Sequence, residues 1–238
     1  MIKDIAQDYG IKLPNLKVWR GKEIAMIELH GTEEDAYNRF PAYLNHLLET
    51  NPIRHVTMQK GSDNKFRRVF ISLVASTYGF KNGNCPIIFL DGTHLKARFL
   101  ENLKNAIGMD QPITFISDRH IGLVDNVSDV FRNSHHAFCE RHMTKNLRNG
   151  MKHIRNDVKN AIISAFQGVT RSFWREEFNL RIADIQNYSQ EAFTWVATST
   201  PERWATSIFR GKRFGQVTTI VADSFNNWIL EARELPIL

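Results

Sequence analysis

The stretch that decides the fold is Cys85-Pro-Ile-Ile-Phe-Leu-Asp-Gly-Thr-His-Leu-Lys96. Its apolar run, residues 87–90, lies between Pro86 and Gly92, which is typical of a short strand buried on both faces. The run ends on Asp91, so a carboxylate follows the carboxyl end of a core strand. Open α/β sheets place ligands and catalytic groups at that edge.

A second strand pattern, Ile113-Thr-Phe-Ile-Ser-Asp118, also ends on an aspartate. Between the two patterns, apolar residues recur at helical spacing: Leu100, Leu103, Ala106 and Ile107. A strand–helix–strand unit predicts parallel strands, so both aspartates should emerge at the same edge of the sheet. Two converging carboxylates can hold Mg²⁺ or Mn²⁺, which prefer oxygen ligands. The structural alternative stays open, since an aspartate after a strand is also a turn former or a helix N-cap.

The composition is that of a soluble globular protein with a mild basic excess. Of the 238 residues, 42% are hydrophobic and 24% are charged, and the formal net charge is +6. A basic excess fits a polyanionic partner such as DNA. The two cysteines do not predict a disulfide scaffold and favour a reducing compartment. Neither a signal-peptide pattern nor an apolar run of membrane-spanning length is present, so we expect a soluble, intracellular protein without a membrane partner.

The N-terminal region is expected to be mostly helical. Thr32 and Asp35 have the spacing of a capping box and predict that a helix begins there. A short strand is predicted at 55–59 and an amphipathic helix at 66–79. The predicted domain organisation is an N-terminal region at 1–84, the first part of an α/β core at 85–150, a helical insertion at 151–208 and a C-terminal helix within 209–238.

Beyond Asp118, the pattern predicts a helix at 121–130, a third strand at 134–139 and then a helix rich in cations. Cys139 and His142 lie three residues apart at this strand–helix junction. Two such residues supply half of a zinc site, but tetrahedral zinc requires four ligands and the chain has no second pair of this kind. We therefore expect no structural zinc.

The turn Arg210-Gly-Lys-Arg-Phe-Gly215 is basic and contains an aromatic residue. Such a turn suits contact with phosphate groups, although an exposed loop with three cations is also common. Near the N-terminus, Trp19 lies between Lys17 and Arg20. It has two interpretations, a nucleic-acid contact or the commoner core anchor with solvated neighbours.

Several stretches together resemble one family. They are Asp4-Ile-Ala-Gln-Asp-Tyr-Gly-Ile, Trp19-Arg-Gly-Lys-Glu, Phe66-Arg-Arg-Val-Phe, Phe89-Leu-Asp-Gly-Thr-His-Leu-Lys, Ile116-Ser-Asp-Arg, His135-His-Ala-Phe-Cys-Glu-Arg-His, Gly211-Lys-Arg-Phe-Gly and Ala222-Asp-Ser-Phe-Asn-Asn-Trp-Ile-Leu-Glu-Ala-Arg-Glu-Leu-Pro. Across most of its length the chain resembles the core of plant Mutator-like (MULE) transposases.

The resemblance implies a ribonuclease-H-like α/β fold with an α-helical insertion before the last catalytic helix. It also implies that three carboxylates hold two divalent metals, Mg²⁺ or Mn²⁺, for cut-and-paste DNA strand transfer. The first carboxylate is carried over to Asp91 and the second to Asp118. The third falls on Asp223, where the family normally has Glu.

The resemblance further maps the family's Cys-x-x-His element onto Cys139 and His142, which we expect to be structural residues near the site. The implied partner is DNA at transposon ends, with Lys96, Lys212 and Arg213 as expected DNA contacts. A nuclear location and a possible homo-oligomer are also implied.

The chain departs from the family pattern in three ways, and we therefore expect impaired activity. A β-hairpin on the order of twenty residues is missing after the first strand, which truncates the sheet and leaves an unprotected edge. Asp223 is one methylene shorter than Glu. We also expect the protein to lack the SWIM zinc finger and an N-terminal DNA-binding region. The alternative is a non-catalytic, domesticated or degenerate DNA- or protein-binding module, and a general ribonuclease-H-type nuclease is a third possibility.

Overall fold

The computed structural model describes residues 7–8, 10–11, 13–51, 53–83, 85–90, 97–108 and 111–230. The chain divides into two compact units. Unit 1 comprises residues 1–69 with 229–238, and unit 2 comprises residues 70–228. The elements that follow the deciding stretch of sequence all belong to unit 2.

Unit 1 contains the helices α2 (Asn15–His30) and α3 (Glu33–Thr50) and most of a two-stranded sheet. Helix α3 begins with the predicted capping box. Thr32 Oγ1 accepts the Asp35 backbone N–H at 3.1 Å, and the Asp35 side chain accepts the Thr32 backbone N–H in return. The capping-box prediction is therefore confirmed. Pro41 lies inside the helix without ending it.

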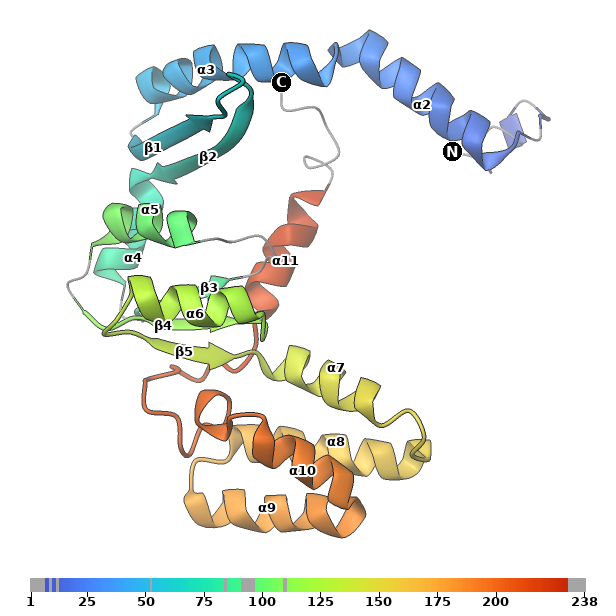
Figure 1. Ribbon diagram of the computed structural model, residues 1–238, viewed down its shortest axis with the longest axis vertical. Helices are drawn as coiled ribbons and strands as arrows, with labels where there is room; N and C mark the ends of the chain where they lie inside the picture. Colours follow the sequence, from blue (N-terminus) through green and yellow to red (C-terminus); the bar gives the residue numbers. More distant parts are fainter. Residues whose placement is uncertain are drawn as a thin grey trace. The chain divides into compact units, whose positions relative to one another are not determined.

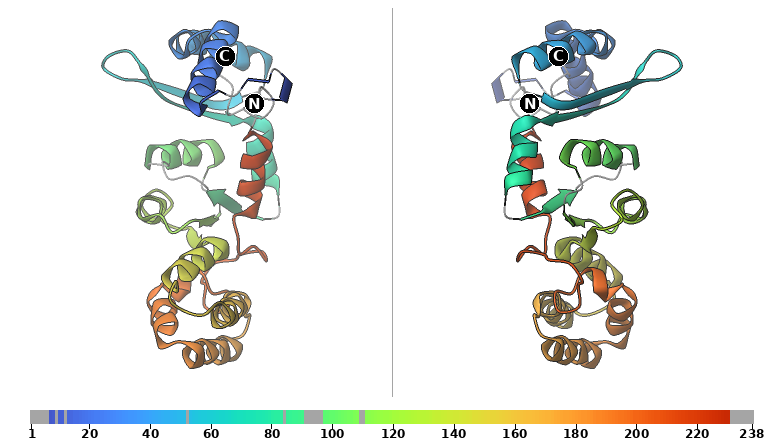
Figure 2. Two further views of the ribbon diagram at one scale, coloured as in Figure 1. Left: turned by 90° about the vertical axis from the view of Figure 1, so that its right-hand side faces the viewer. Right: turned by 90° about the vertical axis from the view of Figure 1, so that its left-hand side faces the viewer.

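A hairpin of β1 (Ile53–Lys60) and β2 (Phe66–Leu73) forms the sheet of this unit. Figure 2 shows its turn projecting beyond α3. The predicted strand at 55–59 is confirmed, but the predicted helix at 66–79 is wrong in its first half. Residues 66–73 are a strand, and only α4 (Val74–Asn82) is helical. The spacing of the apolar residues in 66–73 matches a helix as well as a strand. Pairing with β1 makes this segment a strand, and its aromatic and β-branched residues suit a pleated strand.

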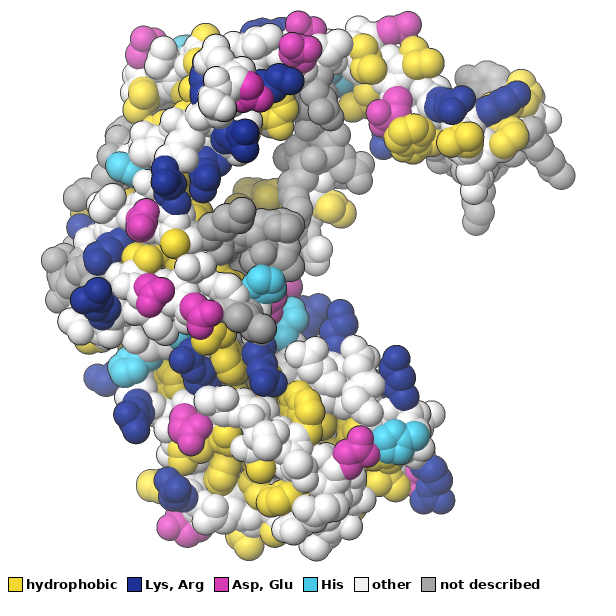
Figure 3. Space-filling view, in the orientation of Figure 1, with side chains coloured by type: hydrophobic (Ala, Val, Ile, Leu, Met, Phe, Trp, Pro, Cys, Tyr) yellow, Lys and Arg dark blue, Asp and Glu magenta, His cyan; other side chains and the backbone are white. Residues whose placement is uncertain are grey.

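Helix α2 exposes much of its apolar surface. Five of its large hydrophobic residues are at least half exposed: Leu16, Trp19, Ile24, Ile27 and Leu29. Figure 3 shows these yellow side chains interspersed with charged ones along the helix. Trp19 is 57% exposed, so the interpretation of this residue as a core anchor is wrong.

The sheet of unit 2 has three parallel strands in the order β3-β4-β5, namely Ile87–Leu90, Thr114–Ser117 and His135–Phe138. The register pairs Leu90 with Ser117, and Ser117 with Phe138. The predicted strands and their parallel direction are thus confirmed. Every residue of β4 is buried, as expected for the central strand.

Two helices connect these strands: α5 (Ala97–Ile107) and α6 (Ile121–Val130). Both were predicted, and both pack on the sheet through one apolar cluster. In this cluster the rings of Phe115 and Phe131 lie 4.8 Å apart, and Leu100 is fully buried between helix and sheet. The strand–helix–strand prediction is therefore confirmed in its packing as well as in its order.

The helices between β5 and the last helix pack together as a second cluster. They are α7 (Glu140–Gly150), α8 (Asn156–Arg171), α9 (Arg175–Tyr188), α10 (Gln190–Thr198) and the short η1 (Pro201–Arg203). Figure 1 shows α8, α9 and α10 stacked against one another below the sheet. Their shared core is centred on Phe166 and Trp204, whose rings lie 5.0 Å apart. Residues 151–208 are thus mostly helical, as predicted, and their role as an insertion stays a prediction.

The final helix, α11 (Ile220–Trp228), returns to the sheet and contacts β3. Its apolar side is largely exposed, since Phe225 and Trp228 are 54% and 80% exposed. Among the residues that the structure describes, β3 pairs with β4 only, so its other side is an edge of the sheet.

No helix among the described residues of the whole chain is both long enough and apolar enough to cross a bilayer.

Candidate active site at the carboxyl ends of the strands

The carboxyl ends of β3 and β4 lie side by side, because Leu90 and Ser117 are register partners. Asp91 and Asp118 are the next residues of the two strands in the sequence. Asp118 is half-buried. Asp91 lies outside the described residues, as does Lys96, so their predicted roles stay predictions.

One oxygen of Asp118 is buried without a hydrogen-bond partner among the described residues. This atom is Oδ1. A buried carboxylate oxygen normally has a donor or a cation beside it, since an unpaired buried polar atom costs about 1–3 kcal/mol. The orphaned oxygen therefore fits a bound divalent cation, which takes hard oxygen ligands.

Cys139 connects the end of β5 to the segment that leads into α11. Its sulfur accepts the Thr219 backbone N–H at 3.3 Å and the Thr219 hydroxyl at 3.4 Å. Burial raises the pKa of the Cys139 thiol, but hydrogen bonds from His142 and Thr219 outweigh burial and bring this pKa to about 7. Thr219 in turn accepts the backbone N–H of Asp223 at 3.1 Å. Cys139 therefore positions the first turn of the helix that carries the third predicted carboxylate.

The charges of both described carboxylates, Asp118 and Asp223, act on the imidazole of His142. Its pKa is raised chiefly by the hydrogen bond with Cys139, and the negative charges of Asp118 and Asp223 raise it further. Both carboxylates are thus within electrostatic range of one imidazole ring. We call this group, Asp118, Cys139, His142 and Asp223, the acidic site.

Asp223 has an ion-pair partner that the sequence did not indicate. Arg141 Nη1 lies 2.6 Å from Asp223 Oδ2, and the two side chains are 58% and 22% exposed. The pair joins the first turn of α7 to the first turn of α11. A guanidinium at this place neutralises one carboxylate of the site and competes with a metal for its oxygens.

The described residues contain no cluster of three or more His, Cys, Asp or Glu side chains able to hold a metal ion. The predicted metal set has three members, and Asp91 is the one that the structure does not describe. The orphaned oxygen of Asp118 fits the predicted cation, whereas the paired carboxylate of Asp223 fits it less well. Cys139 is fully buried and bonded within the protein, which suits the structural role expected for it.

The basic turn lies at the opposite ends of the strands from the acidic site. Thr114, the first residue of β4, donates its hydroxyl to the Lys212 carbonyl at 2.8 Å. A Cβ on Gly211 would lie 2.5 Å from Cγ of His135, the first residue of β5. With a rise of about 3.3 Å per residue, the length of β4 separates the turn from Asp118. Lys212 is exposed, as a phosphate contact requires.

Arg213 is inside the protein rather than on its surface. It is 5% exposed, donates to the Trp204 and Gln216 carbonyls and lies over the Phe209 ring. Burial lowers the pKa of its guanidinium to about 10. In this conformation Arg213 supports the turn from within, and the exposed cations of the turn are Arg210 and Lys212.

Sequence reasoning also missed a buried carboxylate next to Cys139. Glu140 is 2% exposed and forms two hydrogen bonds with Arg171, at 2.7 and 2.9 Å, and a third with the Thr170 hydroxyl at 2.5 Å. Its backbone N–H donates to the Val217 carbonyl at 2.8 Å. Glu140 therefore ties α7 to the end of α8 and to the segment before α11. No local pattern signals this role, because Arg171 lies 31 residues away.

His136 makes the stability of unit 2 depend on pH. Burial, aided by the charge of Arg203, lowers the pKa of its imidazole to about 4. In the unfolded chain the imidazole has its ordinary pKa of about 6.5. Between this pH and about 4 the unfolded state binds a proton that the folded state does not bind, so the folded state loses stability as the pH falls. Stability should fall by about 2 kcal/mol between pH 7 and pH 5 through this residue alone.

Urea unfolding of wild type and His136→Gln at the two pH values measures this contribution. The wild type should lose more stability than the variant over this interval, because glutamine does not titrate. Equal losses in both proteins would show that His136 is not the group responsible.

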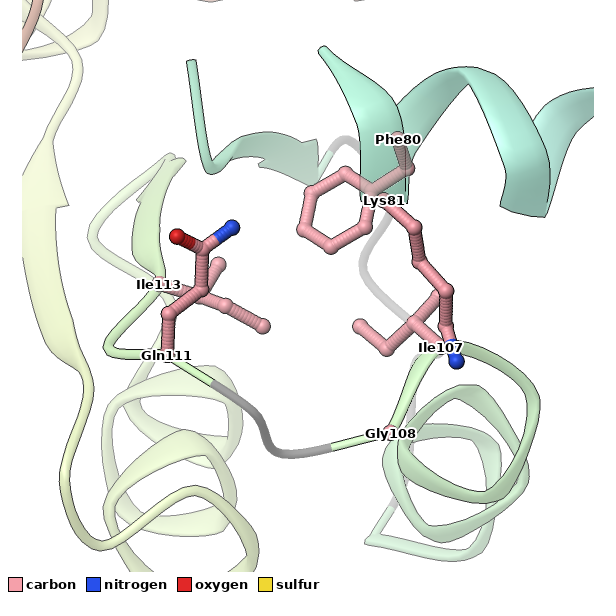
Figure 4. Close-up of a pocket in the computed structure, with 6 residues that line it drawn as sticks. All are labelled: Phe80, Lys81, Ile107, Gly108, Gln111 and Ile113. Atoms are coloured by element: carbon pink, nitrogen blue, oxygen red, sulfur yellow. The ribbon is translucent and has the colours of Figure 1, made fainter. Parts of the chain in front are cut away.

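The cavities of unit 2 lie away from the acidic site. One of about 240 Å³ is lined by six residues, shown in Figure 4: Phe80, Lys81, Ile107, Gly108, Gln111 and Ile113. The figure shows Phe80 and Lys81 coming from α4 and facing the end of α5 and the start of β4. The side chains are mainly apolar, with one cation and one amide, and they offer no nucleophile or acid. A second cavity lies at the amino end of β5.

One comparison with known proteins identifies a family. The model of a family described as "Transposase, Mutator family" matches residues 91–211, just over half of the chain. The match begins at Asp91, includes Asp118, Cys139 and His142, and ends before Asp223. No curated protein matches the chain.

Proposed function

Because the chain belongs to the Mutator family of transposases, we propose that it binds DNA and cleaves and transfers DNA strands with the help of Asp91, Asp118 and Asp223. The family identification supports a transposase-type function. The resemblance to plant MULE sequences and the parallel order of β3, β4 and β5 support a ribonuclease-H-like core. DNA at transposon ends would be the substrate, and a nuclear location follows from that substrate.

The observation that carries the proposal is the buried oxygen of Asp118, which has no hydrogen-bond partner among the described residues, while the charges of Asp118 and Asp223 both act on His142. Two carboxylates within electrostatic range of one imidazole repel each other unless a cation lies between or beside them. Asp91, next after the register partner of Ser117, would be the third carboxylate. These residues would hold Mg²⁺ or Mn²⁺, and such ions, when bound, activate a water or a DNA 3′-hydroxyl and stabilise the leaving oxygen.

The other residues of the site have supporting roles in this proposal. Cys139 holds Thr219, and Thr219 holds the backbone of Asp223, so the third carboxylate is placed by a chain of hydrogen bonds. His142 bonds Cys139, and the charges of both carboxylates help to raise the pKa of its imidazole. Arg141 neutralises Asp223 in the absence of another cation.

We propose that the activity is impaired, because Asp223 is too short and already paired. Its carboxylate reaches about one bond length less far than a glutamate from the same helix position. A displacement of about 1 Å at a reacting centre can cost on the order of a hundredfold in rate. The Asp223→Glu variant should therefore cleave DNA faster than the wild type, by about tenfold or more.

The experiment is strand cleavage of labelled duplex DNA bearing terminal inverted repeats, with Mn²⁺, by wild type, Asp91→Ala and Asp223→Glu. We expect slow cleavage by the wild type, none by Asp91→Ala and faster cleavage by Asp223→Glu. Cleavage that persists in Asp91→Ala would contradict the proposed role of this carboxylate. A slower Asp223→Glu variant would contradict the proposed cause of the impairment.

A second candidate function is a non-catalytic DNA-binding module derived from a transposase. The ion pair between Arg141 and Asp223 favours it, because the pair occupies the third carboxylate. So does the unpaired edge of β3 among the described residues. DNA binding without cleavage by any of the three proteins would support this function over the enzyme.

A further inference from the structure

The second cavity of unit 2, at the amino end of β5, has a volume of about 190 Å³. Most of its polar side chains are basic or hydroxylic, and Glu202 is the acidic residue on its wall. We call it the β5 pocket, and its lining residues are Val127, Ser128, Ser134, His135, His136, Glu202, Arg203, Phe209 and Arg210. Figure 3 shows Lys or Arg side chains and a His side chain close together in this region, to the left of the view.

Two arginines supply the charge of the β5 pocket. Arg210 is exposed, and Arg203 is half-buried with its guanidinium 5.6 Å from the centre of the Phe138 ring. The described residues place no carboxylate within ion-pair distance of either guanidinium. Arginine forks of this kind bind planar or tetrahedral oxyanions through two parallel hydrogen bonds.

Hydrogen-bonding groups on the strand side complete the pocket. Ser134 Oγ accepts the Ile113 N–H at 3.1 Å, which leaves the hydroxyl proton available to donate. His136 is 7% exposed, its Nε2 lies 2.7 Å from Ser117 Oγ, and its Nδ1 is buried without a hydrogen-bond partner among the described residues. Ser117 donates its hydroxyl proton to the Asp118 carbonyl, so Nε2 of the neutral imidazole donates to Ser117 Oγ, and Nδ1 is an acceptor within the pocket wall.

The turn that carries Arg210 is held firmly in place. Gly211 lies so close to His135 that any side chain would collide with the ring, and Thr114 donates to the next carbonyl. Phe209 packs on His135 with their ring centres 6.0 Å apart. The buried guanidinium of Arg213 fixes the other side of the turn. Arg210 is therefore presented on a rigid support rather than on a free loop.

We propose that the β5 pocket binds one phosphate of the DNA backbone, between Arg203, Arg210 and Ser134. The inference rests on the DNA-binding function proposed above and adds a site for it that is separate from the acidic site. Lys212 is exposed on the same turn and would contact a neighbouring phosphate of the DNA backbone. The pocket would bind duplex DNA without sequence preference and would orient it relative to the sheet.

The test measures duplex DNA affinity by fluorescence anisotropy over 50–200 mM salt for wild type, Arg210→Gln and Gly211→Ala. Arg210→Gln should weaken binding on the order of tenfold at the lowest salt, since a hydrogen bond to a charged group is lost. It should also lower the slope of log affinity against log salt by about one unit. Gly211→Ala should weaken binding without any change of charge, because the added Cβ displaces the turn from His135.

Two matched controls separate this pocket from general charge and from general glycine effects. Arg175→Gln removes an exposed arginine at the start of α9, and Gly150→Ala adds a Cβ where no atom lies within 4 Å. Both should bind DNA like the wild type, and thermal melting checks that all four variants fold.

The outcomes distinguish the inference from the proposed function. Equal affinity and equal salt slope for Arg210→Gln and Arg175→Gln, with a wild type that binds DNA, would overturn the pocket alone. A wild type that binds no duplex at 50 mM salt would overturn both. Loss confined to Arg210→Gln and Gly211→Ala supports the pocket.

Discussion

Replacing Glu140 by alanine should destabilise unit 2 by about 3–5 kcal/mol, the largest stability effect that we expect from a single substitution. Its carboxylate is almost fully buried between Arg171 and the Thr170 hydroxyl, and its charge also acts on the buried guanidinium of Arg213. Removal of the anion leaves Arg213, which is 5% exposed, without this compensating charge. Most of the cost arises there, because Arg171 is largely exposed and water can solvate it.

Urea unfolding at pH 7 measures the change, and Glu177→Ala is the matched control. Glu177 also pairs with an arginine, Arg181 at 2.9 Å, but both side chains are 41% exposed and lie on one helix. An exposed pair of this kind contributes below about 1 kcal/mol. Glu140→Gln, which keeps the shape and removes the charge, should fall between the two. If Glu140→Ala is as stable as Glu177→Ala, the carboxylate does not hold α7 and α8 together.

The parallel sheet was predictable because its signals are local. The run 87–90 is wholly apolar, the segment 113–117 is mostly apolar, both are short and are followed by an aspartate, and the helix between them has a clear period. The direction of the strands then follows from chain connectivity. For the same reason the sequence predicted that Asp118 would be at the carboxyl end of its strand.

The hairpin of unit 1 was only half predicted, because residues 66–73 match helical and strand spacing alike. The deciding interaction is the pairing with β1, which lies outside the window that a periodicity argument considers. The exposed apolar side of α11 shows the same limit. Its pattern predicts a packed face, but only a partner elsewhere in the protein can cover it, and the pattern does not identify that partner.

The charged groups of the candidate site were the least predictable part. Arg141 is one of several cations on the predicted cation-rich helix, yet its pairing with Asp223 spans 82 residues. Arg213 and Lys212 are neighbours in one basic turn, but one is buried and the other exposed. Sequence spacing assigns residues to elements, whereas burial and ion pairing depend on which elements meet.

The second large effect concerns Asp118, whose replacement by asparagine should weaken divalent-cation binding at least about tenfold and reduce DNA cleavage to background. The substitution keeps the size of the side chain and removes the charge of the orphaned oxygen. Loss of a residue that merely orients a metal ligand costs 10–100-fold in affinity, so loss of a ligand itself should cost at least about tenfold. Asp125→Asn, on the helix that follows, removes an equal charge outside the acidic site and should leave binding unchanged.

The most direct test of the account is Mn²⁺ binding measured by isothermal titration calorimetry on wild type, Asp118→Asn and Asp125→Asn. This measurement does not depend on catalysis, so it applies to an impaired enzyme as well. Wild type and Asp125→Asn should bind Mn²⁺ with the same affinity, and Asp118→Asn should bind it at least about tenfold more weakly. Equal binding by all three proteins, or none by the wild type, would contradict the proposal that the carboxylates at the ends of these strands form a metal site.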